Sequence, residues 1–197
     1  MLPQSHVVIA GLIYDDIQRE HQVKLNKSQL VFGSVKPDIY SGIPKLKHFK
    51  PQSFDTICRE ISSLAATRID ANEAALGKLS QKIDIVTHYI ADYFCIPHND
   101  RKTYQHHIVN HLRYEMQLHK MFKDSDPVMM HKPSGAVPDL SHTEMVMNYL
   151  DHLHIVYESR PDSYLNDLAS SINAARSVAS LIVRHSITGS ASHTLAA

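Results

Sequence analysis

The sequence predicts an all-α fold, organised as a single-domain multi-helix bundle with a metal cleft between its helices. Apolar residues recur every three or four positions through most of the 197-residue chain, which is the spacing of helices that bury one face. The sequence lacks the alternating apolar and polar runs, bounded by glycines, that indicate strands. His88 and Asp92 lie four residues apart on one expected helix, so an imidazole and a carboxylate share one of its sides.

The first half of the chain is expected to contain three helices. Their apolar stripes cover residues 6–20, 53–69 and 77–94. His6 shares the first stripe with Ile13 and Ile17, so its side chain is expected to point toward the core. Proline and glycine interrupt residues 31–51, and this segment is expected to be a loop.

The second half of the chain is expected to contain three more helices. The first runs from about 101 to 122, the second starts at a capping box, and the last starts near 162. Residues 1–185 are expected to form the helical domain. The small and polar residues 186–197 are expected to form a flexible tail.

Charge and cysteine content exclude several classes of protein. Twenty basic and twenty acidic residues give no net charge, so no overall field attracts nucleic acid or an anionic membrane. No apolar stretch is long enough to span a bilayer, and no signal peptide is visible. Two cysteines are too few for a disulfide framework, which favours a cytoplasmic location.

Ligand-type residues gather around the end of the helix expected at 77–94. His88 and Asp92 share one side of it, and His98 follows at the turn that Pro97 imposes. Nitrogen and oxygen donors at fixed separation are what a borderline cation such as zinc requires. Spacing alone leaves open that these residues form a solvated polar face.

A second imidazole–carboxylate pair, His111 and Glu115, lies on the next helix. It flanks the apolar stripe of Ile108 and Leu112, which is expected to face the core. A carboxylate near a core face is costly to bury unless a cation or a hydrogen-bond donor compensates it. The pair therefore favours a site with more than one metal ion.

Five motifs together point to a known family. They are SHVVIA, PDIY, KHF, HYIADYFCIPH and HLRYE, in this order along the chain. With them the sequence resembles the bacterial zinc-dependent phospholipase C family, as a short, single-domain member. The resemblance covers His6 through Glu115 and implies an all-α protein with zinc ions in a cleft.

The resemblance implies a ligand set at eight positions: His6, Asp38, His48, His88, Asp92, His98, His111 and Glu115. Asp38, His48, His88 and Asp92 would hold the first zinc ion, and His98, His111 and Glu115 the second. Asp92 and His6 would bind a third, which the family completes with the amine and carbonyl of an N-terminal tryptophan. Because this chain contains no tryptophan, two ions are expected, and a third only if the amine of Met1 folds back.

The implied activity is zinc-dependent hydrolysis of a phosphodiester bond, as in phospholipase C. Metal-bound hydroxide would attack the phosphorus in line, and the carboxylate of Asp38 would orient or deprotonate the attacking water. The substrate would be a phospholipid or another phosphodiester. The sequence shows neither an aromatic belt nor a polybasic amphipathic helix for docking to a membrane, so a soluble headgroup compound fits about as well as a membrane lipid.

Two alternatives remain open at this point. Zinc-dependent single-strand nucleases use a similar ligand set, but they need stacking aromatics and a basic groove. The zero net charge and the lack of tryptophan argue against this alternative, and no specific nucleic acid partner is expected. The second alternative is a catalytically inert, metal-binding structural protein.

Overall fold

The described part of the chain consists mainly of helices. The computed structural model describes residues 1–39, 46–69, 72–99, 107–124 and 138–191. Within these ranges there are eight helices and no strand, so the expected all-α class is confirmed. The helices are α1 (Pro3–His21), α2 (Lys27–Ile39), α3 (Lys50–Ala65), α4 (Glu73–Tyr93), α5 (Ile96–Asn99), α7 (Ile108–Asp124), α8 (Thr143–Glu158) and α9 (Tyr164–Ala191).

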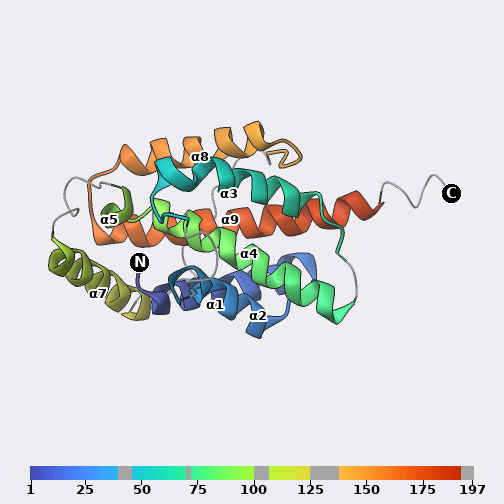
Figure 1. Cartoon of the computed structure of the whole chain (residues 1–197), viewed down its shortest axis with the longest axis horizontal. Helices are drawn as coiled ribbons and strands as arrows, with labels where there is room; N and C mark the ends of the chain where they lie inside the picture. The colour runs from blue at the N-terminus through green and yellow to red at the C-terminus, as the bar shows by residue number, and fades with distance from the viewer. Residues whose placement is uncertain (40–45, 70–71, 100–106, 125–137, 192–197) are drawn as a thin grey trace.

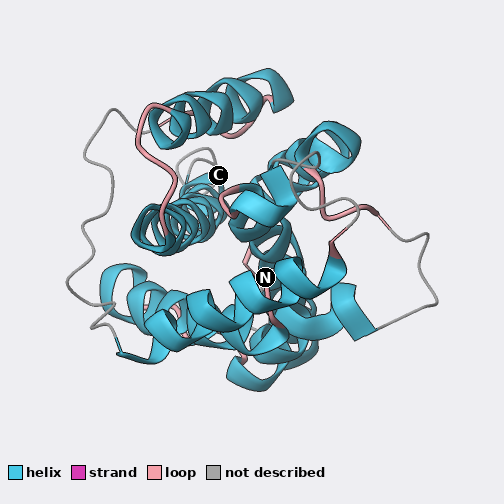
Figure 2. Ribbon diagram, turned by 90° about the vertical axis from the view of Figure 1, so that its left-hand side faces the viewer, coloured by secondary structure: helices cyan, strands magenta, loops and turns pink. Residues whose placement is uncertain are grey.

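Helices α4 and α9 pack together along the middle of the bundle (Figure 1). Helices α3 and α8 cover one side of this pair, and α1 and α2 cover the other. Helix α7 lies at one end, where it packs against α9 and α1. Figure 2 looks at this end of the bundle and shows the chain starting near its middle.

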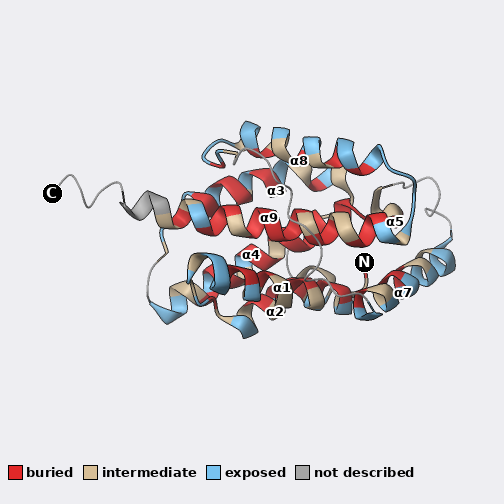
Figure 3. Ribbon diagram, turned by 180° about the vertical axis from the view of Figure 1, so that it is seen from behind, coloured by how far each residue is buried: buried red, intermediate tan, exposed pale blue. Residues whose placement is uncertain are grey.

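The central position of α4 explains its burial. The side chain of Asn72 caps its first turn by accepting a hydrogen bond from the Ala74 N–H at 2.9 Å. Every residue from 86 to 93 is buried, and Figure 3 shows the same predominance of buried residues on α4 and α9. A helix buried on all sides must place its polar side chains inside the protein. His88 and Asp92 are therefore enclosed in the bundle and do not form a solvated face.

The prediction of a loop over residues 31–51 is wrong in its first part, because α2 contains Pro37 and ends only at Ile39. Gly33 allows α2 to pack closely on α4. A Cβ atom at this position would collide with the α4 backbone and lie 3.2 Å from the Cβ of Asp84. The packing of two helices thus outweighs the local preference of proline and glycine for turns. Residues 40–45, in the middle of the expected loop, lie outside the described ranges.

The apolar stripe of α7 also differs from expectation. Ile108 and Leu112 are exposed, so the prediction that they face the core is wrong. The helix buries Glu115, Leu118 and Phe122 instead. Because α7 lies at the end of the bundle, only one of its sides meets other helices, and that side carries the carboxylate.

Helix α9 extends beyond residue 186, where the composition predicts the start of a flexible tail. The buried hydroxyl of Ser186 donates to the carbonyl oxygen of Leu64, 3.1 Å away on α3. This contact holds the helix against its neighbour past the expected boundary. The last six positions of the expected tail, 192–197, lie outside the described residues.

Candidate metal centre

The site begins with His88, which α4 carries into the middle of the bundle. Its Nδ1–H donates to the carbonyl oxygen of Ser34 on α2, at 2.6 Å. This hydrogen bond sets the tautomer, because the proton on Nδ1 leaves the Nε2 lone pair available. The close packing of α2 and α4 therefore orients His88 as a ligand, with Nε2 directed at other donors.

Those donors are Asp38 from the last turn of α2 and His48 from the segment before α3. Together with His88 they form the first cluster, whose ligand atoms all lie within 4.8 Å of one another. His88 Nε2 lies 3.0 Å from His48 Nδ1 and 3.8 Å from Asp38 Oδ1. Asp92, one turn after His88, brings its Oδ2 to within 2.7 Å of His48 Nδ1. The structure thus brings together the four residues assigned to the first ion by resemblance.

The second cluster consists of His98 on α5 with His111 and Glu115 on α7, and its ligand atoms also lie within 4.8 Å of one another. Glu115 Oε1 lies 2.9 Å from His98 Nε2 and 2.8 Å from His111 Nε2. His98 Nε2 is also 3.9 Å from Asp92 Oδ1. Asp92 therefore turns one oxygen toward each cluster and lies between them.

The remaining predicted residue, His6, lies beside the first cluster on α1. Its ring stacks on that of His88 with the centroids 3.7 Å apart, and its Nε2 is 3.3 Å from Asp92 Oδ1. Neither ring nitrogen has a hydrogen-bond partner among the described residues, although the side chain is buried. All eight predicted side chains are accordingly found in one region of the molecule.

The start of the chain folds into the same region. The ammonium group of Met1 donates to Asp92 Oδ1 at 2.6 Å and to His98 Nε2 at 2.7 Å, and it lies 3.1 Å from Glu115 Oε1. Burial acts to lower the pKa of this amine, but the charges of Asp92 and Glu115 outweigh it and raise the pKa to about 11. A positive charge is therefore favoured where the two clusters meet.

Comparison with known proteins agrees with this arrangement of donors. A family model described as zinc dependent phospholipase C matches residues 5–175, which is most of the chain. The chain belongs to the zinc-dependent phospholipase C family. Neither a curated protein nor a solved structure matches it.

The donor set of this family member fits zinc, because imidazole nitrogens and carboxylate oxygens are its usual ligands. Both nitrogens of His6 and the Oδ2 atom of Asp38 are buried without a hydrogen-bond partner among the described residues. Buried polar atoms nearly always have a hydrogen-bond partner in folded proteins. Ligand-type atoms that are buried without such a partner therefore fit a site that binds a cation. Burial also lowers the pKa of His88 and of His98, which keeps both imidazoles in the neutral form that binds metal.

The carboxylates of the centre differ in the direction in which their surroundings shift their pKa. For Asp92, burial acts to raise the pKa, but His98 and the Met1 ammonium outweigh it and hold the pKa well below its ordinary range. Glu115 behaves in the same way, since its close contacts with His111 and His98 and the nearby Met1 ammonium outweigh burial and lower its pKa. Burial raises the pKa of Asp38, and the charge of Asp92 adds to this effect.

A buried acid on α9 supports the second cluster from outside. Asp167 is fully buried, and its Oδ2 accepts hydrogen bonds from the Ile96 backbone N–H at 2.8 Å and the Tyr114 hydroxyl at 3.1 Å. Its Oδ1 accepts from the Tyr157 hydroxyl at 2.8 Å. Burial is the main cause that raises the pKa of Asp167 to about 6. Three helices are thereby tied to the start of α9.

The contacts of Asp167 reach both elements that carry the second cluster. Ile96 begins α5 two residues before His98, and Tyr114 directly precedes Glu115 on α7. Asp167 is not among the eight residues that the sequence predicts. Its signal is an acidic residue inside an apolar helical stripe, which must be compensated by donors if it is buried.

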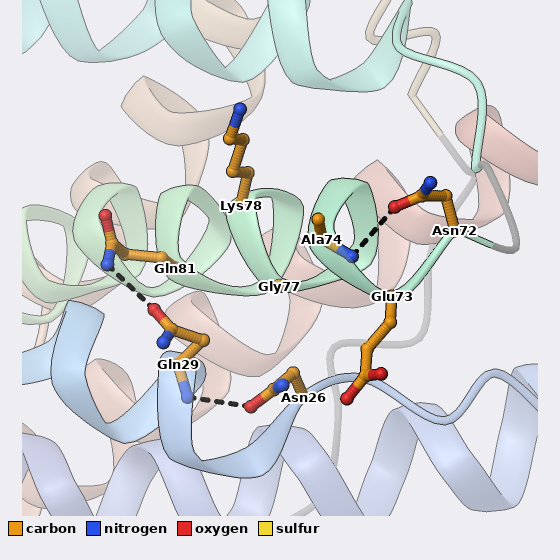
Figure 4. Close-up of a pocket in the computed structure, with 8 residues that line it drawn as sticks. All are labelled: Asn26, Gln29, Asn72, Glu73, Ala74, Gly77, Lys78 and Gln81. Carbon is orange, nitrogen blue, oxygen red and sulfur yellow. Dashed lines mark hydrogen bonds between the residues drawn. The ribbon is translucent and has the colours of Figure 1, made fainter.

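A separate pocket of about 630 Å³ lies between α2 and the first turns of α4 (Figure 4). Amide side chains line much of it, and they are already bonded within the protein. Gln81 Nε2 donates to Gln29 Oε1 at 3.0 Å, and Asn72 caps α4. The pocket holds none of the eight predicted ligands, which lie toward the other end of α4. It is therefore distinct from the candidate metal centre.

Proposed function

We propose that this protein is a zinc-dependent phosphodiester hydrolase that acts as a phospholipase C. The observation that carries the proposal is the position of Asp92 between two clusters of ligand-type side chains, with one oxygen toward each. Membership of the zinc-dependent phospholipase C family supports it independently. Fold resemblance alone would not assign chemistry, whereas a shared carboxylate between two donor clusters is suited to a pair of neighbouring metal ions.

Two zinc ions form the core of the proposal. Asp38, His48, His88 and Asp92 would hold the first, with donors from α2, α4 and the segment before α3. His98, His111 and Glu115 would hold the second, and three protein ligands leave a position open for water or substrate.

His6 and Asp92 offer donors for a third ion, and the Met1 amine lies beside the same oxygen of Asp92. Metal analysis of the purified protein distinguishes two bound ions from three. The hydrolytic proposal itself requires only the two ions at the clusters.

Bound zinc would lower the pKa of a water molecule toward neutrality and neutralise charge on the phosphoryl oxygens. The protein would contribute position and proton handling. Asp38 would orient or deprotonate the attacking water through Oδ2, which is buried without a hydrogen-bond partner among the described residues. The Ser34 carbonyl would keep the proton of His88 on Nδ1 throughout, so that Nε2 stays a ligand.

The substrate class follows from the family, whose name specifies a phospholipid. We therefore propose a phospholipid, or a compound that shares its headgroup diester, as the substrate. No helix in the described part of the chain has the length and apolar character needed to cross a membrane.

The test combines metal analysis with hydrolysis of two substrates, bis-p-nitrophenyl phosphate and short-chain phosphatidylcholine. We expect the protein to bind at least two zinc ions, to cleave both substrates, and to lose activity with a chelator or with His88→Ala. His152→Ala is the matched control, since it removes an exposed imidazole from α8, away from the centre. Activity that survives the chelator or His88→Ala would contradict the mechanism.

The same experiment separates the proposal from its alternatives. Cleavage of single-stranded DNA without cleavage of phosphatidylcholine would favour a nuclease. Bound zinc without hydrolysis of either diester would favour an inert metal-binding protein.

A further inference from the structure

Helix α7 exposes a continuous apolar stripe beside the second cluster. Ile108, Val109, Leu112 and Met116 are exposed by 74%, 64%, 48% and 62%. Ile108, Leu112 and Met116 are spaced by four residues, and Val109 precedes Leu112 by three, so the four share one side of the helix. A different side of α7 packs against the bundle and buries Glu115, Leu118 and Phe122. The stripe is therefore left facing solvent at the end of the molecule, where Figure 3 shows α7.

The stripe adjoins the residues of the candidate metal centre on the same helix. Glu115 follows Leu112 by three residues and therefore lies about 60° away around the helix. His111 lies on the same flank as Glu115, because the two are four residues apart. A surface that rested on this stripe would consequently lie next to the second cluster.

The other flank of the stripe is basic. Lys120 lies about 40° beyond Met116 around the helix, and Arg113 lies further in the same direction. Both are exposed, as is Lys123 near the end of the helix. Asp124 is the one exposed acidic residue within α7, since Glu115 is buried. An apolar stripe flanked by cations is typical of helices that lie in the interface of an anionic membrane.

The size of the stripe argues against a second copy of the chain as its main partner. Residues 108–116 span about 12 Å along a helix, whereas a stable protein interface needs about 800 Å² from each partner. A phospholipid surface has no such size requirement and carries complementary charge.

We propose that the stripe of Ile108, Val109, Leu112 and Met116 docks α7 onto the surface of a phospholipid membrane and presents the second cluster to the headgroups. This inference rests on the proposed function, because it assumes that lipid headgroups are the substrate. The stripe would be a docking surface of another kind than the aromatic belt or polybasic amphipathic helix that the sequence lacks. The sequence alone predicts that Ile108 and Leu112 face the core, and only the position of α7 at the end of the bundle shows that they are exposed.

The test measures vesicle binding apart from hydrolysis. The intact protein is sedimented with vesicles of phosphatidylcholine and phosphatidylglycerol, and compared with an Ile108→Ser/Leu112→Ser/Met116→Ser variant. We expect this variant to bind about a hundredfold more weakly, since three apolar side chains no longer enter the interface. Met145→Ser/Ile155→Ser, which changes exposed apolar residues on α8, is the matched control and should bind like the unchanged protein.

A fluorescent reporter keeps the test valid if the triple variant folds poorly. The chain contains no tryptophan, so Leu112→Trp provides the sole emission of its kind. We expect a blue shift of its emission when these vesicles are added, and no shift for Ile155→Trp on α8. Equal emission with and without vesicles, or equal sedimentation of the triple variant and the unchanged protein, would overturn the proposal. Self-association that the triple variant abolishes, without vesicle binding, would overturn it in favour of a copy interface.

Failure of the docking proposal and failure of the proposed function give different results. If docking is wrong, the protein still cleaves the soluble bis-p-nitrophenyl phosphate but does not bind vesicles. If the enzymatic function is wrong, neither diester is cleaved, whatever the vesicles show. If both are right, the ratio of vesicle hydrolysis to soluble diester hydrolysis falls in the triple variant and not in the α8 control.

Discussion

The two ligand clusters are built on very different supports. The first lies where α2 packs on α4, and the Ser34 carbonyl on the neighbouring helix orients His88 directly. The second lies at the end of the bundle, on a four-residue helix and on α7, and Asp167 holds both from α9. The first cluster therefore depends on helix packing, and the second on one buried carboxylate. A substitution that disturbs only one of these two supports should therefore weaken zinc binding at one cluster more than at the other.

Asp92→Asn should have the largest effect, because the two carboxylate oxygens of Asp92 face different clusters. The substitution removes a ligand of the first ion and a negative charge beside the second cluster, and it leaves the Met1 ammonium without its closest carboxylate. We expect hydrolysis to fall below detection, zinc content to drop at both positions, and the free energy of unfolding to decrease by about 3–5 kcal/mol. Metal analysis and chemical denaturation measure these effects.

Asp151→Asn is the control for this prediction, since it removes a half-exposed carboxylate on α8 that pairs with Lys50. It should leave zinc content and stability nearly unchanged. A protein with Asp92→Asn that keeps one zinc ion at full affinity would show that the clusters do not share this residue.

Gly33→Ala should disturb the first cluster more than the second. The added methyl group meets the Gln81 carbonyl of α4, so α2 must move away and carry Asp38 with it. We expect a loss of about 1–3 kcal/mol in stability and weaker binding of one zinc ion. Gly11→Ala on α1 is the matched control, because its Cβ meets no atom within 4 Å.

The control should even stabilise the protein by about 0.5–1 kcal/mol, since alanine is the better helix former. Zinc titration of the two variants, followed by thermal unfolding, tests the comparison. Equal behaviour of Gly33→Ala and Gly11→Ala would mean that close packing of α2 on α4 does not support the first cluster.

Asp167→Ala should have the opposite selectivity and weaken the second zinc position. It removes the acceptor shared by Ile96, Tyr114 and Tyr157, so α5 and α7 lose their link to α9. We expect about 10- to 100-fold weaker zinc binding at one position, as for other groups that support metal ligands. Asp167→Asn should retain most of the affinity, because its amide oxygen can still accept from Ile96 and Tyr114. If the alanine and asparagine variants bind zinc equally, hydrogen bonding by Asp167 is not what positions the cluster.

The smallest predicted effect is a pH dependence of stability in the chelator-treated protein. Burial raises the pKa of Asp167 from an ordinary 3.8 to about 6, so between these values the folded protein binds more protons than the unfolded chain. The free energy of unfolding should therefore decrease as the pH rises from about 4 to about 6, and above that range it should no longer depend on this group. The slope corresponds to a difference of at most about one bound proton between the folded and the unfolded protein. Denaturation curves of the unchanged protein and Asp167→Asn at several pH values measure the difference. Identical slopes would contradict a raised pKa at this position.

The periodicity of the sequence predicted most helices, because a helix that buries one face must repeat apolar residues at its own period. It failed for two segments. Residues 31–39 contain glycine and proline and look like a loop, yet they form a helix because Gly33 allows close contact with α4. Ile108 and Leu112 look like core residues, yet they are exposed because the partner helices meet another side of α7.

The chain itself predicted that His88 and Asp92, and likewise His111 and Glu115, share one side of a helix, since their spacing fixes this whatever surrounds the helix. Asp38 and His48 were predicted only through the family resemblance. Spacing did not show that the two pairs converge, which only the family resemblance implied, because convergence depends on packing between segments far apart in sequence. The tertiary structure alone decided that Asp92 lies between the clusters, that the Met1 amine reaches it, and that Asp167 supports the second cluster. Local geometry follows from chain connectivity over a few residues, whereas the position of one helix against another follows from the complementary shapes of whole surfaces.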